Sequence, residues 1–440
     1  MSVVRRDTFR RWTAVGAGIA ALCALPGVIG ALPVSAAPVA PTALKARILA
    51  AADHPYQGLV SSAGALDVPA LPQLGAVSSL LGGVTSIRTW FAGPDAWRTD
   101  VDGLTGEQDM YQTPFGTDSW DFETGQITQV VGNPSIRLPR PQDFVPAQLG
   151  LRLLHTAGPS DRLSALAPLK VAGISAAGLE IRPASADSTI GRIDIWADPA
   201  TGVPLQVAVY ARGAARAELT TRFLDVQLTE PAASDVTFLP APGLPVATAT
   251  TSDITSLLDN RALVPLPTSL AGLPASASLA GYGAAVSGYG SGFSTFAALY
   301  LGDRLGDSAM SAATSGGAAP VTFGNGGVGA SGTGRLIQTP LLSVVIARGQ
   351  RFDQVFLLAG FTTPDVLVRA AGDLLTYERD AFPAALCRAF GGFGPPQPAT
   401  GVQAAPAPGG VSPGGAAPST APSGALPGQA PLIVRRCPAQ

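Results

Sequence analysis

The sequence is poor in the residues on which most catalytic and metal sites depend. Its 440 residues include two histidines, His54 and His155, and three cysteines. Lysine occurs only at Lys45 and Lys170, and charged residues make up 13% of the chain. So few histidines and cysteines argue against a zinc site. Both histidines fall at the expected ends of helices, where we interpret them as structural, and we expect no metal and no cofactor.

A basic surface for nucleic acid is also missing. The chain has 28 basic and 30 acidic residues, and without residues 1–36 the balance becomes 24 to 29. Nucleic-acid binding needs a clustered positive footprint, so we expect no nucleic-acid partner. A mildly acidic protein has no electrostatic attraction to an anionic membrane surface either.

The N-terminal 36 residues have the pattern of an export signal. Four arginines between residues 5 and 11 precede an uncharged run over 12–32, and Val34-Ser35-Ala36 fits a small-x-small cleavage site. We therefore expect an extracytoplasmic protein of the cell envelope. The apolar run is long enough to cross a bilayer, so an uncleaved membrane anchor remains the alternative.

Two cysteines remain after export, Cys387 and Cys437. An oxidising compartment favours a disulfide between them. It would close a loop of about 50 residues and contribute about 4 kcal/mol in the chain-entropy model. Most of that loop belongs to the tail 391–440, which is rich in Pro, Ala and Gly and which we expect to be disordered. Two unpaired thiols are the alternative.

The segment Gly191–Gly213 is the most informative part of the chain. Apolar residues alternate on both sides of Asp198-Pro199-Ala200-Thr201-Gly202. In that turn Pro fixes φ, and Gly accepts a positive φ. The pattern predicts a β-hairpin with one dry face and one wetter face.

The strand and turn signals predict an α+β protein with two domains. Short alternating runs over 84–131, helices at 43–50 and 143–155, and later strands ending near 239 indicate a meandering antiparallel sheet. The expected parts are a half-barrel domain at 42–245, a connector at 246–281, and a smaller α+β domain at 282–390 with a closing helix at 363–377.

Three nominal motifs fail on their context. Gly324–Gly329 matches GxGxxG but is followed by more glycine and no helix to hold a pyrophosphate. Gly410–Gly414 matches GxSxG, yet Pro413 lacks the N–H that an oxyanion hole requires. Asp100-Val101-Asp102-Gly103 lacks the further acidic ligands of a calcium loop, so we interpret it as a strand end and turn.

Aromatic residues are few, at 6% of the chain, and most fall on predicted strands of the first domain. Each can be ordinary core, or several can line a hydrophobic cavity between the sheet and its helices. The cavity hypothesis names eight residues: Phe91, Trp97, Tyr111, Trp120, Phe122, Trp196, Tyr210 and Phe223.

The run from Trp90 to Arg98, followed by Tyr111 and Trp120, resembles the early strands of the LolA/RseB superfamily. Ile195–Pro199 with Gly202–Leu205 resembles its late hairpin. The second domain, with strands expected over 334–348 and 351–361 and a closing helix, is more similar to the small C-terminal domain of RseB/MucB than to anything in LolA. The loop over 66–83 and the long tail depart from the family pattern.

The resemblance implies a concave half-barrel closed by helices, with a hydrophobic interior for lipid acyl chains or a lipoprotein. RseB-like members are regulators that act through a membrane-bound anti-sigma factor, whereas LolA-like members carry lipoproteins across the envelope. Neither kind is an enzyme. We therefore expect a non-enzymatic regulator, with a LolA-like carrier as the alternative. A hydrolase would need Ser, His and Asp side chains converging in one cleft.

Overall fold

The computed structural model describes residues 39–66, 80–102, 106–133, 137, 139–240, 243–250, 265–276, 285–324, 332–349 and 354–380. The expected signal, the 391–440 tail and the cysteine pair Cys387 and Cys437 lie outside the described residues. Among those that are described, no helix combines the length and hydropathy that a membrane span requires.

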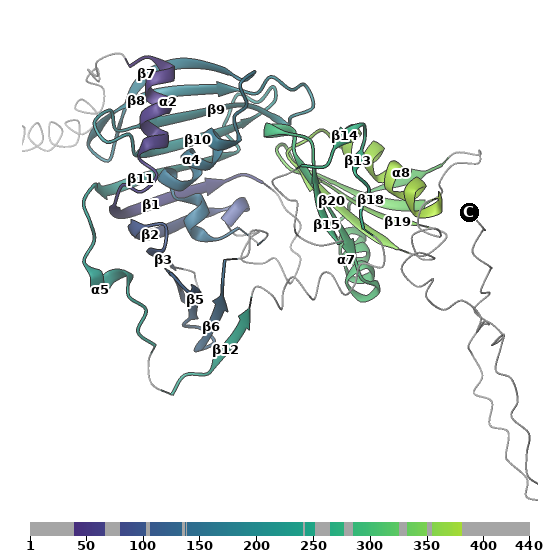
Figure 1. Ribbon diagram of the computed structural model, residues 1–440, viewed down its shortest axis with the longest axis horizontal. Helices are drawn as coiled ribbons and strands as arrows, with labels where there is room; N and C mark the ends of the chain where they lie inside the picture. Colours follow the sequence, from purple (N-terminus) through teal and green to yellow (C-terminus); the bar gives the residue numbers. More distant parts are fainter. Residues whose placement is uncertain are drawn as a thin grey trace, which may run out of the picture.

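A twelve-stranded sheet forms the larger part of the molecule (Figure 1). Its strand order is β12-β6-β5-β4-β3-β2-β1-β11-β10-β9-β8-β7, and every pairing is antiparallel except that of β12 with β6. The strands are β1 Tyr56–Gly64, β2 Val84–Gly93, β3 Ala96–Asp102, β4 Glu107–Thr113, β5 Gly116–Asp121, β6 Gln126–Val131, β7 Arg162–Val171, β8 Ile174–Arg182, β9 Ile190–Ala197, β10 Pro204–Ala211, β11 Leu219–Gln227 and β12 Val246–Thr250. The sheet is not closed into a barrel, which confirms the predicted fold class.

Helices cover one face of this sheet, which we call the inner face. They are α2 (Pro41–Ala50), the short 3-10 helix η2 (Pro141–Phe144) and α4 (Pro146–Thr156). A further short helix, α5 (Ala233–Val236), is not one of these covering helices. Leu44 and Ile48 of α2 and Leu154 of α4 are fully buried in one cluster with the sheet residues. The apolar side chains of alternate strand positions thus meet the apolar side of each helix.

A second, six-stranded sheet has the order β15-β16-β20-β19-β18-β17. Its strands are β15 Val286–Tyr289, β16 Phe296–Leu301, β17 Ala319–Phe323, β18 Gly332–Gln338, β19 Ser343–Gly349 and β20 Val355–Gly360. Helix α8 (Pro364–Asp380) packs with Val345 and Ala347 on one face, and α7 (Asp303–Ser315) packs with Ile346 on the other. The small η4 (Gly292–Ser294) and the ribbon β13–β14 (Ser269–Leu270, Leu273–Pro274) complete this part.

Two segments that the sequence indicates as single strands each contain a turn in the structure. In the first, over 170–182, residues 170 and 171 are the end of β7, which turns into β8 at Ala172 and Gly173, and both of these residues have positive φ. The predicted strand over 334–348 is β18 followed by β19. Strand β12 lies within the expected connector but pairs with β6, so the first sheet extends to Thr250.

The two sheets touch through the segment Asp187–Thr189, between β8 and β9, which we call the junction segment. Ser188 is fully buried, forms an antiparallel bridge with Thr362, and donates its hydroxyl to the Phe293 carbonyl at 3.0 Å. The Thr189 N–H donates to Phe361 O at 3.0 Å, and the Thr363 N–H donates to Asp187 O at 2.8 Å. Main-chain and side-chain hydrogen bonds therefore join the two parts.

Candidate functional site

The eight aromatic residues of the cavity hypothesis are divided between the two faces of the large sheet. Because side chains alternate along a strand, strand register assigns each residue to a face. Phe91, Trp97 and Phe223 lie on the inner face and are buried in the core. The other five lie on the opposite, outer face: Tyr111, Trp120, Phe122, Trp196 and Tyr210. The structure therefore does not bring the eight together around one space.

The inner-face aromatics pack against their neighbours. The ring of Tyr56 stacks on Phe91 at 4.9 Å and meets Phe223 edge-on at 5.8 Å. The Tyr56 hydroxyl accepts hydrogen bonds from Gln142 and Gln148. Large buried side chains from the sheet and from α2 and α4 thus fill the region beneath these helices.

Farther along the inner face, polar side chains replace apolar ones. Thr89 donates to Gln142, and Gln112 is bonded to Thr117 and Asn133. Buried polar groups are normally paired in this way.

The twelve-stranded sheet has a hollow of about 240 Å³ where the β7–β8 turn approaches β10 and β11. Lys170, Arg222, Phe223 and Leu224 are among its lining residues. A second hollow of about 430 Å³ lies between α7 and strands β18 and β19. Typical ligand pockets have about 300–1,000 Å³, so the first hollow is small for a lipid.

A charged cluster occupies the outer face of the β3–β4 hairpin, and we regard it as the candidate site. Arg98 Nε lies 2.6 Å from Asp100 Oδ1, and Arg98 Nη2 lies 2.9 Å from Asp109 Oδ2. Both carboxylates are almost fully buried. The Arg98 guanidinium also sits 5.0 Å from the ring centres of Trp90 and Tyr111. The site therefore combines buried charge with aromatic rings, which strengthens cation–π attraction.

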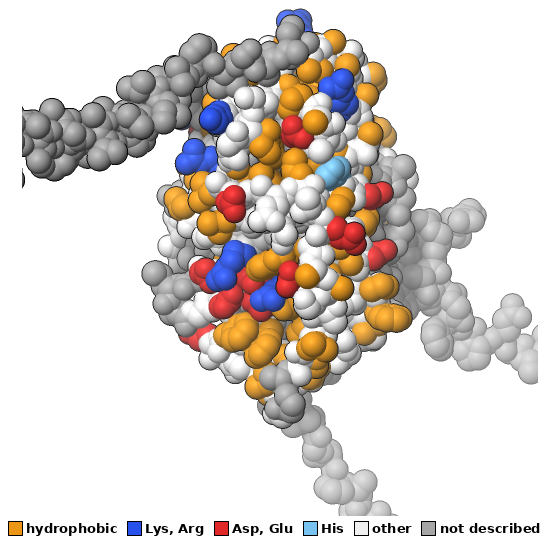
Figure 2. All heavy atoms as spheres, turned by 90° about the vertical axis from the view of Figure 1, so that its left-hand side faces the viewer, with side chains coloured by type: hydrophobic (Ala, Val, Ile, Leu, Met, Phe, Trp, Pro, Cys, Tyr) orange, Lys and Arg blue, Asp and Glu red, His pale blue; other side chains and the backbone are white. Residues whose placement is uncertain are grey.

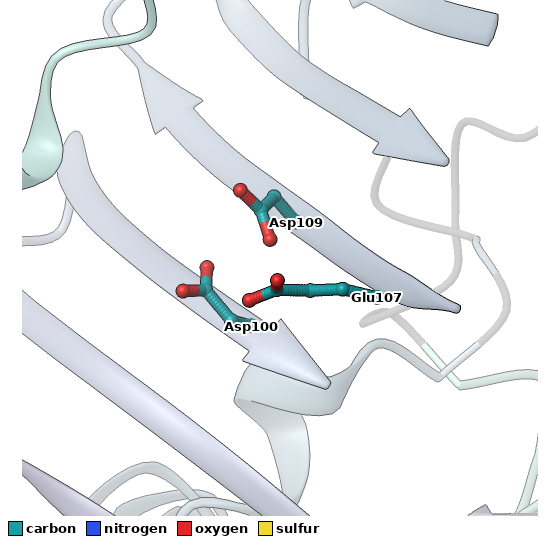
Figure 3. A group of neighbouring side chains, drawn as sticks. All are labelled: Asp100, Glu107 and Asp109. Atoms are coloured by element: carbon teal, nitrogen blue, oxygen red, sulfur yellow. The ribbon is translucent and has the colours of Figure 1, made fainter. Parts of the chain in front are cut away.

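Burial and the neighbouring Asp100 carboxylate raise the pKa of Asp109 to about 7, against the attraction of Arg98. Glu107 adds a third carboxylate from the same hairpin, and the three offer ligand atoms within 4.8 Å of one another. Figure 3 shows the three side chains converging from two adjacent strands. Perturbed pKa values of this kind gather at functional sites.

Sequence reasoning considered Asp100 and Asp102 as part of a calcium loop and found no further acidic ligands, so it missed that Glu107 and Asp109 lie beside Asp100. The cluster arises from the register of the β3–β4 hairpin, in which Asp100 pairs with Asp109 and Asp102 pairs with Glu107. Acidic residues at alternate positions on the two strands of a hairpin share one face. The short spacing between the two runs could have indicated the cluster.

The residues that a hydrolase would use do not converge in the part of the chain that the structure describes. His54 Nδ1 lies 2.9 Å from Pro55 O, and neither His54 nor His155 forms a described hydrogen bond with a serine or a carboxylate.

After Gly324 the next described element is the strand β18, so a strand rather than a helix follows the GxGxxG match. Figure 2 shows acidic and basic side chains interleaved on one side of the molecule.

The fold is that of an open antiparallel half-barrel with helices on its inner face and a second sheet attached. No protein-family model matches the chain, and no curated protein matches it. MucB of Pseudomonas aeruginosa, solved with MucA, is similar over 74% of this chain and 95% of that chain, at 16% identity and a TM-score of 0.40.

A further crystal structure of MucB is similar over 75% of this chain and 96% of the MucB chain, at 15% identity and a TM-score of 0.38. A LolA superfamily protein from Nitrosomonas europaea is similar over 46% of this chain and 98% of its own, at 12% identity and a TM-score of 0.23. The last of these structures is named as a LolA superfamily protein, and the sequence resembles that superfamily. At such identities and TM-scores these matches carry no argument about function.

Proposed function

We propose that the protein is a non-enzymatic, exported regulator of the cell envelope that resembles RseB. It senses a lipid or a lipoprotein and acts through a membrane-bound anti-sigma-type partner. The signal-like N-terminus supports export, and the ordered aromatic and hairpin motifs support the RseB-like assignment. The expected domains, 42–245 and 282–390, are part of this proposal.

The observation that carries the proposal is the hydrogen-bonded junction between the two sheets. Phe293 and Leu341 of the second part belong to the same buried cluster as the core of the first, and Ser188 and Thr362 are fully buried between them. A body built of two joined sheets presents a composite surface that a protein partner can recognise. A ligand that shifts one sheet would alter that surface.

The carrier alternative is less well supported by the same geometry. A carrier needs a ready hydrophobic cavity, whereas Tyr56, Phe91 and Phe223 fill the space beneath the helices. One acyl chain of about 16 carbons gains roughly 12 kcal/mol on burial. Displacing packed aromatic side chains would consume part of that gain.

The partner can be tested by photocrosslinking in the native host. A photoreactive phenylalanine analogue replaces Phe361, which is half-exposed beside the junction, or Phe115, which is exposed in the β4–β5 turn away from it. We expect a crosslink at position 361 to one single-pass membrane protein and none at position 115.

Deletion of the gene for this protein and deletion of the captured membrane protein should change transcription of the same sigma-factor regulon. A captured protein without that effect, or no crosslink at position 361, would contradict the proposal. Native mass spectrometry of the purified protein tests the sensing step separately, since a bound lipid adds a discrete mass.

A further inference from the structure

The candidate site on the β3–β4 hairpin has an unusual division of its charges. Along the two strands, the pair Arg98 and Tyr111 comes first, the pair Asp100 and Asp109 next, and the pair Asp102 and Glu107 last. Arg98 therefore contacts the two central carboxylates from one side. Glu107 lies on their other side, toward the end of the hairpin where its strands are joined.

One buried oxygen of this cluster lacks a partner. The Arg98 guanidinium pairs with Oδ1 of Asp100 and with Oδ2 of Asp109. Asp109 is only 2% exposed, and its Oδ1 is buried with no hydrogen-bond partner among the described residues. Figure 3 shows the Asp109 carboxylate directed toward those of Asp100 and Glu107. When Asp109 is ionised, a buried oxygen without a partner is strongly unfavourable.

The charges of the cluster do not balance. Four carboxylates, those of Asp100, Asp102, Glu107 and Asp109, face two guanidinium groups. The second guanidinium, that of Arg88, pairs with Asp102 at 3.2 Å and lies 3.6 Å from Glu107. When all four carboxylates are ionised, two negative charges remain in excess among these described groups, which is the charge that one divalent cation supplies.

We propose that Asp100, Glu107 and Asp109 bind a divalent cation, best fitted by Ca²⁺, on the side of the cluster away from Arg98. All three ligands are carboxylate oxygens, which suit hard cations, and no histidine or cysteine of the described residues joins the group to favour zinc. Their ligand atoms lie within 4.8 Å of one another, a spacing that Ca²⁺–O distances of about 2.3–2.6 Å can bridge.

Calcium suits this site better than magnesium because it accepts six to eight ligands in irregular geometry. The Glu107 side chain is 34% exposed, so water can enter and complete the coordination shell. Three side chains on two strands make a shallow site. We expect an affinity in the range of extracellular calcium modules, about 10⁻⁴–10⁻³ M. This inference does not depend on the proposed regulatory function.

Terbium luminescence on the full-length protein tests the site. Trp120 lies opposite Asp109 in the sheet register and can sensitise bound Tb³⁺. We expect a saturable signal that Ca²⁺ displaces and that equimolar Mg²⁺ displaces poorly. Calcium at 10 mM should also raise the melting temperature by a few degrees, since it binds only the folded state.

The variants D109N and E107Q should weaken Ca²⁺ binding at least tenfold. The control D95N, which removes an exposed carboxylate at the opposite end of β3, should stay within twofold of the wild type. Far-UV circular dichroism establishes that each variant is folded. Trp120→Phe should reduce terbium emission but leave the calcium-dependent melting shift unchanged.

Three results would overturn the proposal: no effect of calcium on the wild type, equal binding by D109N, or equal losses in D95N and D109N. A fourth would be a calcium-insensitive melting temperature that depends on pH near 7 in the wild type but not in D109N. In that case a proton shared by Asp100 and Asp109, and no metal, relieves the charge.

Discussion

Asp143, at the start of the helical segment over the sheet, shows how one carboxylate can hold several elements. It accepts hydrogen bonds from Arg137, from Arg152 and from the backbone N–H of Arg140, at 2.6–2.9 Å. Burial alone would raise the pKa of Asp143, but the two guanidinium groups lower it to about 2. The ionised form is therefore the one that the fold stabilises.

We predict that D143N lowers the free energy of unfolding by about 2 kcal/mol at pH 7, because hydrogen bonds to a charged group are lost. Since the folded-state pKa lies below the unfolded value of about 3.9, this stabilisation should disappear as pH falls from about 4 to about 2. Urea unfolding at several pH values measures it, with D95N as the control. A difference that persists undiminished at pH 2 would contradict the assignment.

Asp109 should have the opposite pH dependence. Its pKa is raised to about 7 by burial and by Asp100, so in metal-free protein the folded state binds a proton that the unfolded state has released. The free energy of unfolding should then fall as pH rises from about 4 to about 7. D109N, which cannot ionise, should lack this component in chelator-treated samples. Parallel stability curves for the wild type and D109N would show that Asp109 does not titrate in this window.

The hairpin Gly191–Gly213 is the element that the sequence predicted best. Strands β9 and β10 pair as expected, and Gly202 has the positive φ (+87°) that the turn requires. The Asp198 carboxylate accepts hydrogen bonds from the backbone of Thr201 and from its hydroxyl. What the sequence could not show is that the turn docks on helix α2, where Arg47 donates to Pro199 O.

Gly202 is therefore required for two reasons, and a matched glycine separates them. A Cβ on Gly202 would lie 2.4 Å from Arg47 O, whereas a Cβ on Gly213, which also has a positive φ (+77°), would meet nothing within 4 Å. We predict that G213A costs about 1 kcal/mol from backbone strain alone. G202A should cost about 3 kcal/mol, because strain and displacement of α2 add. Urea unfolding compares the two, and equal losses would show that α2 does not depend on this contact.

At the scale of the whole molecule, the sequence predicted the class of fold because alternating strands and turn residues are local signals. It predicted neither the hairpin turn at Ala172, where a residue other than glycine has positive φ, nor the pairing of β12 with β6, which joins strands distant in sequence. The division of the aromatic residues between the two faces follows from the strand register. A shift of the register by one residue would move each side chain of a strand to the opposite face. The acidic cluster has the same origin: Asp100 and Asp109 become neighbours only when β3 and β4 pair.

The junction segment makes a prediction about how the two sheets behave together. The buried Ser188 hydroxyl donates to Phe293 O and accepts from the Ile190 N–H. S188A would leave both groups unpaired in a buried place, which costs about 1–3 kcal/mol for each such group. Ser185 provides the control, because its hydroxyl accepts only from the Asp187 N–H within the same loop among the described contacts.

We expect calorimetry of the wild type to show one cooperative transition for both sheets, because the cluster around Phe293 and Leu341 is shared. S188A should split it into two transitions and raise hydrogen exchange at Phe361–Thr363, whose backbone bonds to the junction segment. S185A should leave a single transition. Two separate transitions in the wild type would mean that the junction does not couple the sheets, and a regulatory signal passed between them would then need another route.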